Sequence, residues 1–96
     1  MKVKLKYFAR LREIVGKVEE TITLPEDATV KKLIEVLSEM YGATLRDYIY
    51  DRGGAEPSPN LNFLLDGRNI MMLNGMDTRL YDGCVFVIIP PVGGGV

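Results

Sequence analysis

An amphipathic helix between Thr29 and Gly42 is the feature that most constrains the fold of this chain. Its apolar residues recur at spacings of i, i+3, i+4, i+7, i+10 and i+11, and polar residues fill most of the positions between them. The apolar positions are Val30, Leu33, Ile34, Leu37, Met40 and Tyr41. Thr29 is expected to cap the start of the helix and Gly42 to end it. A helix with one apolar stripe cannot bury that stripe alone, so the sequence predicts a sheet on which it lies.

A half-buried strand is predicted at the start of the chain, because residues 2–8 alternate between apolar and basic side chains. The apolar set is Val3, Leu5 and Tyr7. Phe8 has the parity of the lysines, so it either ends the strand or lies on its outer face. Residues 9–15 contain no glycine or proline and are predicted to form a short helical turn that ends at Gly16.

A second strand is predicted for residues 18–24, which end at Pro25. Its inward-facing set is Val18, Ile22 and Leu24, and Glu20 interrupts the pattern. After the amphipathic helix the signal is weaker. Residues 44–47 could start another short helix, and residues 52–60 are predicted to be a surface loop to which we assign no chemistry.

The last third of the chain is predicted to add three strands to the sheet. Residues 61–65 and 69–71 flank Asp66-Gly67, a pair typical of a tight hairpin. Residues 85–89 are apolar at every position, as in a central strand buried on two faces. One face can lie against the helix. The other face is either an exposed apolar patch where a partner docks or is covered by a loop, and the sequence leaves both alternatives open.

The chain changes character after residue 89, which divides it into a domain of residues 1–89 and a tail of residues 90–96. Pro90 and Pro91 cannot continue the ladder of hydrogen bonds and project the following residues away from the sheet. The glycines that follow give a thread of small cross-section, suited to a narrow tunnel in another protein. A frayed terminus is the alternative, since glycine-rich chain ends are common.

Composition restricts the classes of function. The 96 residues carry a net charge of −1 and a single cysteine, and they include no histidine. We therefore expect one domain, no internal disulfide, and no field that attracts nucleic acid or an anionic membrane. The absence of an apolar run of membrane-spanning length predicts a soluble, cytoplasmic protein. Without histidine, a metal-ligand cluster or a phosphate-binding loop, we expect no independent catalysis, no metal and no permanently bound cofactor.

The predicted order of strand, strand, helix, strand, strand, strand is that of an α+β fold, the β-grasp, with a mixed sheet of four to five strands, one main helix and short helical turns. The chain resembles the small, ubiquitin-like sulfur-carrier subunit of molybdopterin synthase, in the family shared with the thiamine-pathway carrier and ubiquitin-like modifiers. The resemblance is carried by Tyr7-Phe8-Ala9, Arg12-Glu13, Asp66-Gly67-Arg68, residues 80–83 and above all residues 90–95.

The chain departs from the family at Val96, which follows the diglycine Gly94-Gly95, and at Cys84, where an acidic residue is usual. The resemblance implies that a partner of the ubiquitin-activating type uses ATP to adenylate Gly95, once a protease has removed Val96. A sulfur donor then displaces AMP. The resulting thiocarboxylate delivers sulfur to a pterin precursor in the large synthase subunit.

The resemblance also implies a set of site residues. Gly94 and Gly95 form the reacting tail, with Pro90 and Pro91 as its rigid root. The candidate partner-docking residues are Phe8, Arg12, Phe86 and Ile89. Ordinary core packing is the open alternative for Phe8 and Phe86, and Cys84 is expected to be a small buried hydrophobe.

Other functions use the same tail. The chain could be a protein modifier conjugated to lysines through Gly95, a sulfur carrier for thiamine synthesis or tRNA thiolation, or a binding module whose tail is never activated. The sequence does not decide between carrier and modifier, because both need the same diglycine and the same type of activating enzyme.

Overall fold

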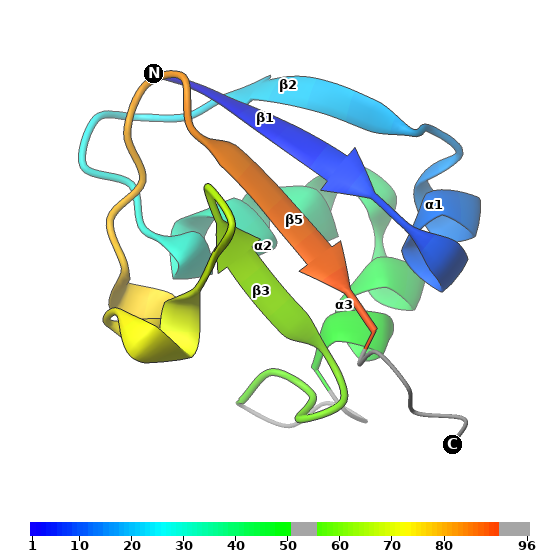
Figure 1. The fold of residues 1–96 in the computed structure, drawn as a ribbon. Helices are drawn as coiled ribbons and strands as arrows, with labels where there is room; N and C mark the ends of the chain where they lie inside the picture. The colour runs from blue at the N-terminus through cyan, green and yellow to red at the C-terminus, as the bar shows by residue number, and fades with distance from the viewer. Residues whose placement is uncertain (51–55, 91–96) are drawn as a thin grey trace.

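A five-stranded mixed sheet, with helices packed on one of its faces, forms the protein (Figure 1). The computed structural model describes residues 1–50 and 56–90. The strand order is β2-β1-β5-β3-β4, in which β1 and β5 are parallel and the other pairs are antiparallel. The strands are β1 (Lys2–Tyr7), β2 (Glu19–Thr23), β3 (Asn62–Leu65), β4 (Arg68–Asn69) and β5 (Val85–Ile89). The last strand lies beside the first, so the predicted β-grasp is confirmed.

The main helix, α2 (Val30–Tyr41), has the predicted bounds and caps. The Thr29 hydroxyl accepts a hydrogen bond from the Lys32 amide at 3.4 Å, and the Gly42 amide donates to the Ser38 carbonyl at 2.8 Å. The first four members of the apolar stripe are fully buried, and Tyr41 is half-buried. Met40 is 49% exposed, contrary to prediction. It follows Val30 by ten residues, and a rotation of about 100° per residue places its side chain at the margin of the apolar stripe.

Two shorter helices complete the layer behind the sheet. They are α1 (Ala9–Val15) and α3 (Ala43–Ile49), and each buries two side chains in the core. The first confirms the predicted helical turn before Gly16. The second, α3, begins at Ala43, one residue before the range 44–47 that was predicted to start a short helix.

The predicted hairpin forms at Asp66-Gly67, where both residues have positive φ, 49° and 83°. Its return strand is shorter than predicted. The Asn69 side chain accepts a hydrogen bond from the Met71 amide at 2.9 Å and starts a 3-10 turn, η2 (Ile70–Met72), in place of a longer strand. A second turn, η3 (Gly75–Asp77), follows it.

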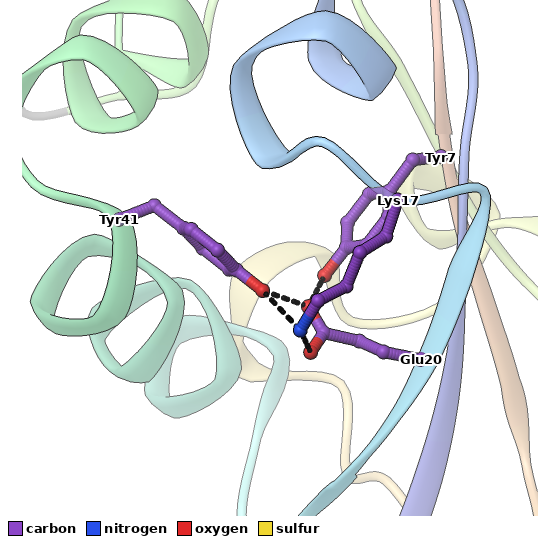
Figure 2. A network of polar contacts seen from close by, with 4 residues as sticks. All are labelled: Tyr7, Lys17, Glu20 and Tyr41. Carbon is purple, nitrogen blue, oxygen red and sulfur yellow. Dashed lines mark hydrogen bonds and ion pairs between the residues drawn. The ribbon is translucent and has the colours of Figure 1, made fainter.

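Glu20 is the feature of β2 whose role the sequence pattern did not reveal. Its carboxylate faces the helices and accepts hydrogen bonds from the hydroxyls of Tyr7 and Tyr41, both at 2.5 Å, and from the Lys17 ammonium at 3.2 Å (Figure 2). Tyr7 is fully buried, so its hydroxyl needs an acceptor inside the protein. Glu20 thus ties β1, β2 and the end of α2 together. Val18, predicted to face inward, precedes β2 and is 59% exposed.

The electrostatics of this cluster follow from its burial. Burial and the contact with Glu20 raise the pKa of Tyr7 far above its usual value. Burial alone would also raise the pKa of Glu20. Hydrogen bonds from Tyr41, Tyr7 and Lys17 outweigh that effect and hold the pKa of the Glu20 carboxyl below its ordinary value.

We expect Glu20→Gln to lower the free energy of unfolding by about 1–3 kcal/mol at neutral pH, because two tyrosine hydroxyls lose a charged acceptor. In the parent protein, ionised Glu20 contributes its full stabilisation at pH values above the unfolded-state pKa of a glutamate, about 4.3. This stabilisation is lost as the pH falls through the lower pKa that Glu20 has in the folded protein. Urea denaturation at several pH values measures both effects. The control is Glu19→Gln, which alters an exposed ion pair with Lys4. An acid-induced loss of stability as steep in Glu20→Gln as in the parent would contradict this assignment.

Candidate functional site

The side of the sheet that faces away from the helices is the candidate site (Figure 1). Along β5, Phe86 and Ile88 are buried beneath the helices, whereas Val85, Val87 and Ile89 are only half-buried. The two faces of β5 therefore differ, contrary to the prediction of burial on both. Of the two alternatives for the second face, the half-burial of these side chains favours a partly exposed apolar patch.

Neighbouring strands enlarge this patch. Val87 pairs with Leu64 of β3, which is half-buried and points to the same side of the sheet. Phe8 follows Tyr7, the register partner of Ile88, and so lies level with Ile89. The open-face patch consists of Phe8, Leu64, Val85, Val87 and Ile89. On its β1 side it is bordered by Lys4 and Lys6, the register partners of Val85 and Val87.

A cation lies against the aromatic end of the patch. The Arg12 guanidinium carbon is 5.5 Å from the centre of the Phe8 ring, and its Nε donates a hydrogen bond to the Tyr7 carbonyl at 3.1 Å. Phe8 is 38% exposed. The fold thus brings together three of the four predicted docking residues, Phe8, Arg12 and Ile89, from the two ends of the chain.

Phe86 is the exception among the predicted docking residues. Its side chain is fully buried and meets the Phe63 ring edge to face, with 6.0 Å between ring centres. Since neighbours in a strand point to opposite faces, Phe86 cannot share a surface with Val87. Core packing, the open alternative for Phe86, is what the structure shows.

The root of the tail lies beside this surface. β5 ends at Ile89, and the half-buried Pro90 leaves the sheet one residue beyond the level of Phe8. Pro91, Gly94, Gly95 and Val96 lie outside the described residues, so their roles remain predictions.

Cys84 immediately precedes Val85, the first residue of β5, and is fully buried. Burial, followed by the charge of Asp66, raises the pKa of its thiol to about 11, which leaves it protonated at neutral pH. In residues 1–50 and 56–90 no group of three His, Cys, Asp or Glu side chains could hold a metal ion. In the same part of the chain, no helix has the length and apolarity needed to cross a membrane.

Sequence reasoning missed Leu64. The prediction for residues 61–65 is a strand, with neither of its faces assigned to the core. The signal was available, because Leu64 stands between two positions that the β-grasp order places over the helix, Phe63 and Leu65.

A β-grasp sheet, in which the last strand β5 lies parallel beside the first strand β1, is the fold of ubiquitin-like proteins. The chain belongs to the ThiS family, whose profile matches residues 5–95. It is accordingly a member of a family of small ubiquitin-like sulfur carriers and protein modifiers.

Three relatives illustrate this membership. The chain is 36% identical over 95 residues to small archaeal modifier protein 3 of Haloferax volcanii, covering 99% of this chain and 100% of that protein. Its structure is similar to that of small archaeal modifier protein 1 of Methanosarcina acetivorans, with a TM-score of 0.83, 32% identity and coverage of 98% and 96%. It is also similar to the Pyrococcus furiosus protein named "Putative molybdopterin converting factor, subunit 1", with a TM-score of 0.75, 35% identity and coverage of 96% and 99%.

The different positions of Phe8 and Phe86 lead to opposite expectations for their alanine variants. Phe86→Ala leaves a cavity in the core and should lower the free energy of unfolding by about 3–5 kcal/mol. Phe8→Ala removes a partly exposed ring and its contact with Arg12, which should cost about 1 kcal/mol. Urea denaturation of both variants checks this. Equal losses would mean that Phe8 is a core residue like Phe86.

Proposed function

We propose that this protein is the small, sulfur-carrying subunit of a molybdopterin synthase. The observation that carries the proposal is the position of the open-face patch, which lies at the point where Pro90 leaves the sheet toward the diglycine. A carrier needs both parts: a surface that holds the partner, and a reacting end that reaches the partner's active site. The similarity to the Pyrococcus furiosus protein supports the choice of pathway.

The reacting group in this proposal is the carboxylate of Gly95, exposed once a protease removes Val96. A terminal carboxylate with a pKa of about 3.5 is ionised at neutral pH and is a poor acyl donor. A ubiquitin-activating-type adenylyltransferase joins the carboxylate oxygen to the α-phosphate of ATP, which releases pyrophosphate. A sulfur donor then displaces AMP and leaves a thiocarboxylate.

The large subunit of the synthase receives this thiocarboxylate and transfers its sulfur to a pterin precursor. The carrier supplies the reacting group and the docking surface, and its partners supply the catalytic groups. ATP is bound by the activating enzyme, and we assign no resident cofactor to the carrier. Within the carrier, Phe8, Arg12 and Ile89 contribute the docking contacts nearest the tail.

Protein modification is the second candidate function. Small archaeal modifier protein 3 of Haloferax volcanii is 36% identical over nearly the whole chain. In this alternative the same glycyl adenylate is passed to lysine side chains of other proteins, and the open-face patch binds the same type of activating enzyme.

The mass of the intact protein, isolated from its own cells without acid or reducing agent, tests the proposal. We expect a chain that ends at Gly95 with one oxygen replaced by sulfur, because the thiocarboxylate is the loaded form of the carrier. A full-length chain with an unmodified Val96, in cells that make the cofactor, would overturn the proposal. Adducts of higher mass that survive denaturation and reducing agent would favour the modifier function.

Leu64→Arg tests the docking surface, since it places a charge in the open-face patch beside Val87. We expect the KM of the activating enzyme for the carrier to rise by about tenfold or more, with kcat unchanged. The measurement is pyrophosphate release at a series of concentrations of carrier trimmed to end at Gly95. Thr21→Arg is the matched control, because Thr21 is exposed on the edge strand β2. Equal effects of the two variants would exclude the patch as the docking surface.

A further inference from the structure

Ala9 has an unusual backbone conformation for a residue with a side chain. Its φ is 52°, in the left-handed region, where the β-carbon of an L residue is crowded by its own backbone. In the described part of the chain, the other non-glycine residues with positive φ are Asp27 and Asp66. Aspartate tolerates this region because its short polar side chain can form hydrogen bonds nearby, as Asp66 does with the Val85 amide at 2.9 Å. Alanine has no such compensation.

Contacts on both sides hold Ala9 in this conformation. Phe8 before it is extended, with φ −135° and ψ 156°, and α1 after it is anchored in the core by Leu11 and Val15. Arg12 closes the turn. Its amide donates to the Phe8 carbonyl at 3.4 Å, and its Nε donates to the Tyr7 carbonyl at 3.1 Å. The left-handed residue therefore sits where the chain changes direction from β1 into α1.

This turn determines where two docking residues lie. It leaves the Phe8 ring on the open face, level with Ile89, and brings the Arg12 guanidinium to 5.5 Å from the centre of that ring. A negative φ at Ala9 would start α1 in another direction, and Arg12 could not then reach both the Tyr7 carbonyl and the Phe8 ring.

We propose that Ala9 is a positioning residue for partner docking: its left-handed turn holds Phe8 and Arg12 together at the root of the tail. The inference rests on the proposed function, in which the partner that takes the tail also contacts the open-face patch. Local strain of this kind persists when surrounding contacts fix the conformation, and it is concentrated at functional surfaces.

Two substitutions change the energy of the turn in opposite directions. Glycine adopts positive φ without steric cost, whereas the branched side chain of valine resists it more than alanine does. Ala9→Gly should keep the turn and leave the KM of the activating enzyme for the carrier within about twofold of the parent value. Ala9→Val should displace Phe8 and raise the KM about tenfold, with kcat unchanged.

The matched control is Ala43→Val. Ala43 begins α3, which has seven residues like α1, and it is not among the residues with positive φ. The same exchange there tests the general effect of valine at the start of a short helix. An increase in KM as large as that of Ala9→Val would overturn the proposal.

NMR of the free protein tests the turn itself. We expect nuclear Overhauser effects from the Phe8 ring to Arg12 and Ile89 in the parent and in Ala9→Gly. They should be lost in Ala9→Val, while the amide signals of the distant strands remain unchanged. Lost contacts without a rise in KM, or a rise in KM with the contacts intact, would each overturn the role of Ala9.

If the Ala9→Val variant does not fold, Ala9→Gly still tests the proposal. The glycine variant must then keep both the NMR contacts of Phe8 and the parent KM, and the loss of only one of them would overturn the proposal. A failure of the proposed function is recognised separately. In that case the parent protein, trimmed to end at Gly95, would not be adenylated, although the NMR contacts of the turn would still be observed.

Discussion

The parallel pairing of β1 with β5 is the constraint on which the rest of the structure depends. It places the first and last strands side by side in the middle of the sheet, with Tyr7 opposite Ile88. Residues near the two ends of the sequence thereby meet at one edge of the open face. Phe8 and Arg12 come from the start of the chain, Ile89 and Pro90 from its end. The candidate site exists only because this long-range pairing forms.

The other consequence of the fold is that, in the described part of the chain, helices cover one face of the sheet and leave the other open. In residues 1–50 and 56–90 the α-helices are the long α2 and the short α1 and α3, and each of them buries side chains in the core (Figure 1). The outward side chains of β5 stay apolar although the helices do not cover them. Exposed apolar area on a small protein is a typical sign of a binding surface. The fold and the proposed function thus agree on which face a partner would contact.

Much of the fold was predictable, because local patterns report local structure. The stripe and caps of α2, the hairpin at Asp66-Gly67 and the turn at Gly16 depend on residues close together in the sequence. Two errors had local causes, the exposure of Met40 and the short return strand after Gly67, and the others occurred where distant residues decide. Glu20 has the inward parity of its strand, and what the sequence did not reveal is that Tyr7 and Tyr41 supply hydroxyl donors to it from two other elements. Phe8 and Phe86 are both phenylalanines at or near a strand. Only the pairing of the strands shows that Phe8 lies on the surface and Phe86 in the core.

By itself, the sequence determined the element order, the β-grasp class and the diglycine ending, because periodicity, capping and turn signals depend on near neighbours along the chain. Tertiary structure alone decided that Arg12 lies over Phe8 beside Ile89, that Leu64 joins the same patch, and that Ala9 adopts a left-handed turn. These features depend on which strand pairs with which and on where α1 is anchored. Contacts across the sheet set them, and those contacts leave no local signal in the sequence.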